Sequence, residues 1–175
     1  VKSSKSAAAN LARSRDLLND VKGIINSTYQ SIGARSRASL IDVAAVEQRH
    51  IARSLNSTLE ASLVDTNVNL PQLEKLVDKT LILGAPAAEW WKRQSVGLQE
   101  RFADQIRMGV LQGETTDEMI KRVRGTYTGK KITVVDEAGK SKKVPQFAGG
   151  VMQTTTREAE ALVRTSVQSI ANATR

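Results

Sequence analysis

The chain has 175 residues, a net charge of +8 and a pI near 10.0, and it contains one histidine and no cysteine. Disulfides and thiolate metal sites are therefore excluded, and one histidine alone cannot build a zinc site. No apolar run approaches the roughly 20 residues that span a bilayer, so no membrane segment is predicted. Aromatic residues make up only 3% of the chain, which favours packed helices over a β-sandwich.

Apolar residues at helical spacing predict several helices in the first half. One stripe begins at Leu11, and the stretch 31–39, which contains Gly33, is expected to break or kink it. A stronger stripe without Pro or Gly covers 41–63. Its apolar face is rich in alanine, as in helices that pack closely or form a coiled coil. We therefore expect 41–63 to be a docking surface for a partner or a neighbouring copy.

A boundary is predicted near residue 84. Asn69 is expected to cap a short helix that ends at Gly84, and Pro86 then suits the first turn of the next helix. The sequence thus predicts an N-terminal helical region at 1–83 and a second helical domain at 84–175. The chain begins without Met and ends within a helical pattern, so we expect it to be part of a longer protein that continues past residue 175.

Two capping boxes and a hairpin are predicted in the second half. Thr115 with Glu118, and Thr155 with Glu158, have the spacing at which a hydroxyl and a carboxylate cap a helix start. Between them, β-branched residues flank a connector that ends in glycine, which predicts a β-hairpin near 131–144. A loop is expected to follow the hairpin. The predicted class is mainly α, an elongated helical protein with one small β-hairpin insertion.

No catalytic constellation is visible in the sequence. Gly129 and Lys130 are followed by Lys131, where a phosphate-binding loop requires Ser or Thr. His50 lies between two arginines on a helical pattern, which is typical of a solvated surface. We expect a protein that is not an enzyme and needs no cofactor or metal.

Two features could mediate binding. Trp90 and Trp91 are adjacent in an aromatic-poor chain. Such a pair can supply one core residue, one docking anchor for a partner, or both, because neighbouring helical side chains point about 100° apart. The segment 121–143 holds eight basic residues against Asp136 and Glu137. It is either a solvated face or a contact for DNA phosphates or an acidic partner. The residues expected to make that contact are Arg122, Arg124, Lys130, Lys131, Lys140, Lys142 and Lys143.

Three stretches together resemble the Mu-like head-morphogenesis family, the minor head proteins of tailed phages. They are GAPAAEWWK at 84–92, LQERFADQIRMGVLQGETTDEMI at 98–120, and REAEALVRTSVQSIANATR at 157–175. The first two are similar to a family helix that ends in glycine and is followed by a Ser/Thr-capped short helix. The third resembles the family's closing helix. The lysine-rich hairpin would then be an insertion between the matching parts.

The resemblance implies a structural role in the virion, with the host cytoplasm as the place of assembly. Such proteins associate with the portal or the inner procapsid in several copies, and support head assembly, DNA packaging or DNA delivery. The family has no catalytic residues to carry over. An alternative that shares the charge and the helices is a sequence-non-specific DNA-binding protein of nucleoid or regulatory type.

Overall fold

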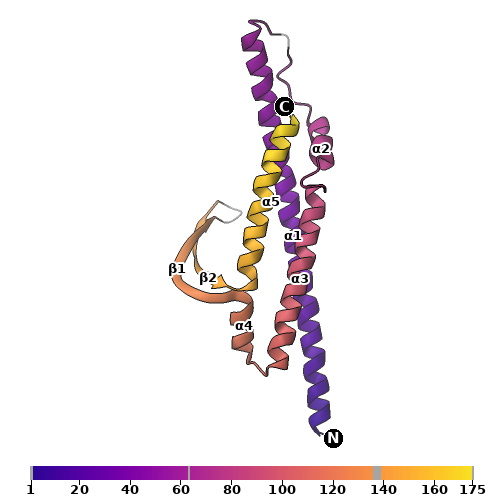
Figure 1. Cartoon of the computed structure of the whole chain (residues 1–175), viewed down its shortest axis with the longest axis vertical. Coiled ribbons are helices and arrows are strands. Elements are labelled where there is room, and N and C mark those ends of the chain that lie inside the picture. The colour runs from indigo at the N-terminus through magenta and orange to yellow at the C-terminus, as the bar shows by residue number, and fades with distance from the viewer. Residues whose placement is uncertain (1, 63, 136–138, 175) are drawn as a thin grey trace. The chain divides into compact units, whose positions relative to one another are not determined.

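The computed structural model describes residues 2–62, 64–135 and 139–174, and within them the chain forms five helices and one two-stranded sheet. This confirms the predicted class, mainly α with one β-hairpin. None of the described helices combines the length and hydropathy needed to cross a membrane. The elements, drawn in Figure 1, are α1 (Lys2–Thr58), α2 (Leu70–Lys79), α3 (Ala87–Leu111), α4 (Thr116–Arg124), β1 (Gly125–Val135), β2 (Ser141–Gly149) and α5 (Val151–Thr174).

The chain divides into two compact units that are each built from distant stretches. The first unit contains the residues up to Lys22 together with Val96–Glu158, and the second contains Gly23–Ser95 together with the residues from Ala159 onward. The boundary predicted near residue 84 therefore lies inside the second unit. The physical reason is that the start of α3, beyond that boundary, packs against α1, before it.

Helix α1 is continuous, so the break predicted over 31–39 is wrong. At Gly33 a Cβ atom would lie 3.5 Å from Cδ1 of Trp91, in van der Waals contact with the ring. The glycine thus brings the helix backbone close to the indole of α3. Burial against Trp91 offsets the low helix propensity of glycine, which the local sequence alone would not do.

The core of the second unit is formed by small and branched residues. The alanine-rich stripe of α1 provides Ala44 and Ala45, and α5 provides Ile170. Helix α2 begins at the predicted cap, where the side chain of Asn69 accepts a hydrogen bond from the Gln72 amide. The buried cluster consists of Leu40, Ala44, Ala45, Leu73, Val77 and Ile170.

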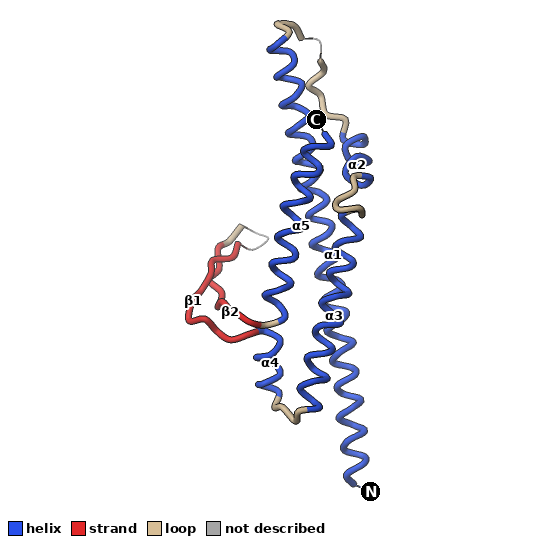
Figure 2. The backbone as a smooth tube through the Cα atoms, in the orientation of Figure 1, coloured by secondary structure: helices blue, strands red, loops and turns tan. Residues whose placement is uncertain are grey.

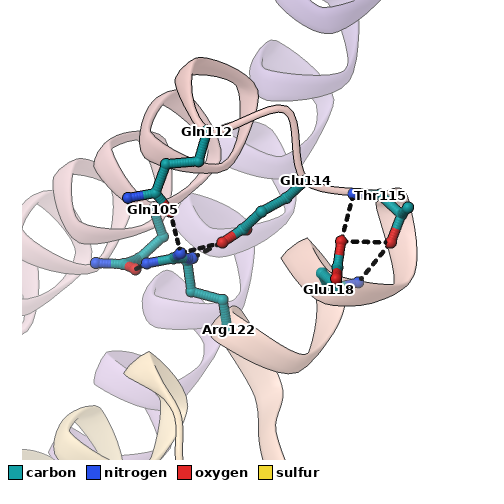
Figure 3. Close-up of polar contacts among 6 residues, drawn as sticks. All are labelled: Gln105, Gln112, Glu114, Thr115, Glu118 and Arg122. Atoms are coloured by element: carbon teal, nitrogen blue, oxygen red, sulfur yellow. Dashed lines mark hydrogen bonds and ion pairs between the residues drawn. The ribbon is translucent and has the colours of Figure 1, made fainter.

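The capping box predicted at the start of α4 is confirmed. The Thr115 hydroxyl oxygen accepts a hydrogen bond from the Glu118 amide at 3.4 Å, and Oε2 of Glu118 accepts one from the Thr115 amide at 2.7 Å. Figure 3 shows both bonds at the turn before α4. Helix α3 runs through Gly97 without a break and ends at Leu111.

The second predicted capping box is wrong, because α5 begins earlier, at Val151. The Gly149 amide donates a hydrogen bond to Oε1 of Gln153 at 2.8 Å, so this backbone N–H just before the helix has a partner. Thr155 is buried inside the helix, where its hydroxyl donates to the Val151 carbonyl. Glu158 instead accepts two hydrogen bonds from Arg101 of α3, at 2.8 and 2.9 Å.

Three carboxylates make the fold sensitive to acid. Hydrogen bonds from Arg37 lower the pKa of Asp78, those from Thr115 lower the pKa of Glu118, and those from Arg101 lower the pKa of Glu158. A carboxyl whose pKa is lower in the folded state contributes stability above its unfolded pKa and loses it as the pH falls through the folded value. The ordinary values are 3.8 for Asp and 4.5 for Glu.

We therefore expect the midpoint of urea unfolding to be constant from pH 7 to 6 and to fall steadily below pH 4.5. The variant Glu158→Gln should unfold at lower urea at pH 7 but depend less on pH, since one of the three titrating groups is gone. Circular dichroism at each pH gives both curves. A midpoint that stays the same down to pH 3 would contradict these assignments.

Candidate functional site

Strands β1 and β2 form an antiparallel hairpin, here called the arm and defined as the described residues within 125–149. Figure 2 shows its strands in red, leaving the end of α4 and returning to the start of α5. The arm is longer than the hairpin predicted near 131–144, and the loop expected after Val144 is part of β2. Pro145 is tolerated there because both strands of a two-stranded sheet are edge strands.

An aromatic pair fixes the base of the arm. Tyr127 and Phe147 are cross-strand partners, with ring centroids 5.8 Å apart. The guanidinium of Arg124, at the end of α4, lies 4.2 Å from the centre of the Phe147 ring. Aromatic pairs and cation–π contacts both stabilise such a junction. Sequence reasoning missed this cluster; its only signal is two aromatic residues twenty positions apart in an aromatic-poor chain.

Glycines at the base of the arm let two backbone segments approach each other closely. Gly125 has a φ of +89°, and it pairs with Gly149 across the hairpin. A Cβ atom at Gly150 would lie 2.3 Å from the Gly125 amide nitrogen and 2.4 Å from the Arg124 carbonyl carbon. The end of α4 and the start of α5 therefore meet backbone to backbone, and the arm leaves this junction.

The lysines of the arm are divided between its two faces. Cross-strand partners share a face and successive residues alternate. Since Thr133 pairs with Lys143 and Lys131 pairs with Pro145, the first face carries Lys131 and Lys143. Lys142 lies on the second face. The lysines therefore do not form one patch, because strand pairing brings side chains together only where the register places them on the same face.

The remaining two lysines lie outside the regular ladder. Lys130 is within the irregular stretch between Tyr127 and Lys131, and Lys140 precedes β2. All five lysines are exposed. Among the described residues, no ion pair is formed by Lys130, Lys131, Lys142 or Lys143. Asp136 and Glu137, the acidic residues of the connector, lie outside the described residues.

The second face of the arm is also apolar. Ile132 and Val134 are each 44% exposed, and Val144, the partner of Ile132, is half-buried. These residues lie beside Lys142, the partner of Val134. Val135, 62% exposed, lies on the first face, so the arm presents both cations and branched side chains on each of its faces.

The two predicted arginines have structural contacts. Arg122 forms an ion pair with Glu114 and donates hydrogen bonds to Gln112 at 2.7 Å and Gln105 at 3.4 Å (Figure 3). The hydrogen bond to Glu114 raises the pKa of Arg122. Since Arg124 lies over Phe147, both arginines hold α4 and the arm base in place. Arg122 is half-buried, whereas Arg124 is exposed and remains with the lysines in the exposed basic site.

The two tryptophans have different environments in the second unit. Trp91 is 3% exposed and lies 6.4 Å from Tyr29 between ring centroids. Trp90 is half-buried, and its indole N–H donates to the Ile82 carbonyl. One tryptophan thus fills the core and the other remains partly accessible, and only Trp90 can offer surface to a partner. A cleft of about 610 Å³ beside Trp91 is also lined by residues that include Tyr29, Leu40, Val77 and Pro86.

Metal-ligating side chains do not gather in the described part of the chain. No group of three or more His, Asp or Glu side chains there could hold a metal ion. His50 lies on the exposed surface of α1, close to Arg49 and Arg53. The arm is accordingly the most distinctive candidate for function. Comparison with models of known families, with curated proteins and with solved structures found no significant match.

Proposed function

We propose that this chain is a structural, non-enzymatic minor head protein of a tailed phage. It associates with the portal or the inner procapsid and supports head assembly, DNA packaging or DNA delivery. The observation that carries the proposal is the position of the stretches that resemble the head-morphogenesis family. The stretches 84–92 and 98–120 lie over most of α3 and the start of the capped α4, and 157–174 lies within α5. The basic arm occupies the interval between them, as expected of an insertion in a family scaffold.

The exposed apolar side chains of α1 and the turn after it suit contact with a head protein. Leu55 and Leu59 are 45% and 54% exposed, and they lie four residues apart on the same side. Monomeric proteins can expose single apolar residues without consequence. A pair at the end of the alanine-rich stripe, close to the half-buried Ile51, has the pattern of a helix face that packs on a partner.

The test is binding to the portal protein encoded with this chain. We expect the purified chain to form a defined complex with portal oligomers in size-exclusion chromatography. The double variant Leu55→Ser and Leu59→Ser should weaken that complex at least tenfold. Ile24→Ser is the control, since Ile24 is an apolar residue of α1 that is even more exposed, at 65%, and lies outside the proposed face.

Two results would contradict the proposal: absence of any complex with portal or capsid protein, or normal infectious particles when the gene is deleted. The exposed lysines of the arm favour one alternative function, a free-standing DNA-binding protein of nucleoid type. That protein would bind duplex DNA tightly by itself and would ignore portal oligomers. The two functions are therefore separated by the portal experiment, in which the nucleoid-type protein would form no complex.

A further inference from the structure

We propose that the arm inserts into the major groove of duplex DNA, with the lysines of its two faces directed to the phosphates on the two sides of the groove. The inference rests on the proposed function only in taking the packaged genome as the available duplex. It concerns how the arm binds, not where the protein is assembled.

The distribution of the lysines carries the argument. Lys131 and Lys143 lie on one face of the hairpin and Lys142 on the other, and all three are exposed. A flat anionic surface could meet only one of these faces. An anionic groove that encloses the ribbon meets both, so each lysine gains a phosphate. Lys130, Lys131, Lys142 and Lys143 form no ion pair among the described residues, so these four like charges repel each other unless anions lie nearby.

The dimensions agree with the major groove. Paired strands lie about 4.8 Å apart, and a major groove about 12 Å wide and 8.5 Å deep admits a two-stranded ribbon. The minor groove, about 6 Å wide, does not admit a ribbon with its side chains unless the duplex is deformed.

Two other occupants fit less well. Single-stranded nucleic acid is bound through stacking aromatics, but the arm's aromatic residues, Tyr127 and Phe147, lie at its base and contact each other. An acidic protein groove would need carboxylates on both walls, whereas duplex DNA has phosphates on both sides of its groove at every step. Lysines also protect strand edges from pairing with other chains, but that role predicts no affinity for DNA.

The ordered base of the arm lowers the conformational entropy that is lost when the arm inserts into the groove. The glycine junction and the Tyr127–Phe147 pair hold the start of the arm before any ligand binds. A prearranged ribbon loses less conformational freedom on binding than a loop of the same charge. The base also sets the arm's direction through backbone contacts, so substitutions among the outer lysines should leave the fold intact.

The experiment measures the affinity of the full chain for a 30-base-pair duplex by fluorescence anisotropy across a range of NaCl concentrations. Each phosphate contact contributes about −0.9 to the slope of log affinity against log salt. The pair Lys131→Gln and Lys143→Gln should therefore reduce the steepness by about 1.8, and Lys142→Gln by about 0.9. Lys75→Gln with Lys79→Gln, on the exposed surface of α2, is the matched control and should change nothing.

Groove choice is tested with the same duplex. Methylation of guanine N7, in the major groove, should weaken binding at least fivefold, while a minor-groove ligand should not compete. The proposal is overturned if Lys142→Gln leaves the slope unchanged, because contact is then one-sided. It is also overturned if low salt gives no duplex binding but the chain binds polyglutamate, which would identify an acidic protein as the partner.

The outcome for the arm can be separated from the outcome for the proposed function. The lysine variants should bind portal oligomers as the unaltered chain does. A chain that binds duplex with the expected slopes but forms no portal complex would refute the head-protein function and leave the arm inference standing. A chain that binds portal oligomers but not DNA would refute the arm inference and leave the head-protein function standing.

Discussion

Replacing Trp91 with alanine should lower the free energy of unfolding by about 3 kcal/mol, near the lower end of the range for a buried aromatic residue. Trp91 is one of two tryptophans in a chain with few large side chains, and it packs against Tyr29 and the backbone at Gly33. The lower end applies because a cleft already lies beside the ring, so water can enter part of the space. Urea unfolding followed by circular dichroism measures the loss.

Two further variants separate the effect of the lost ring volume from that of the lost indole N–H donor. The buried indole N–H of Trp91 has no hydrogen-bond partner among the described residues. Trp91→Phe keeps most of the ring and removes that donor, so it should cost less than half as much as Trp91→Ala. Trp90→Ala removes a half-buried ring and should also cost less. Equal losses at the two tryptophans would show that Trp91 is not the core residue described here.

Replacing Gly150 with alanine should destabilise the chain by about 1–3 kcal/mol, the range for overfilling a packed site. The added Cβ would lie 2.3 Å from the Gly125 amide nitrogen and 2.5 Å from the Val123 carbonyl oxygen. These atoms belong to the backbone, so the end of α4 and the start of α5 would have to separate. We expect the arm base to open, which would expose β1 and β2 to proteolysis at concentrations that leave the unaltered chain intact.

Gly97 provides the matched control in the same unit. It lies within α3, and a Cβ atom there would meet nothing within 4 Å. Gly97→Ala should therefore stabilise the chain by about 0.5–1 kcal/mol, since alanine loses less backbone entropy in a helix. The same substitution is thus expected to have opposite signs at two glycines. A neutral or stabilising effect at Gly150 would refute the backbone junction.

The sequence alone determined those features that depend only on residues close together along the chain. The cap at Asn69 and the capping box of Thr115 with Glu118 involve atoms three residues apart or closer. The existence of the hairpin follows from alternating β-branched residues around a glycine-ended connector. Such signals act within one turn or one strand pair, so composition and spacing are sufficient to find them.

Other features were decided only by tertiary structure. Thr155 and Glu158 have the spacing of a cap, but Arg101, 57 residues before Glu158, binds that carboxylate in the folded chain. Burial against Trp91 lets α1 continue through Gly33, against local propensity.

The candidate site also combines a feature that the sequence reveals with one that only the folded structure decides. Its charge is visible in the sequence as a run of lysines, but their arrangement depends on the strand register, and a shift of one residue would move every side chain to the opposite face. The pairing of Thr133 with Lys143 is what places Lys142 apart from Lys131 and Lys143. An irregularity between Tyr127 and Lys131 separates this register from that of the arm base, where Tyr127 pairs with Phe147 and Gly125 lies close to Gly150.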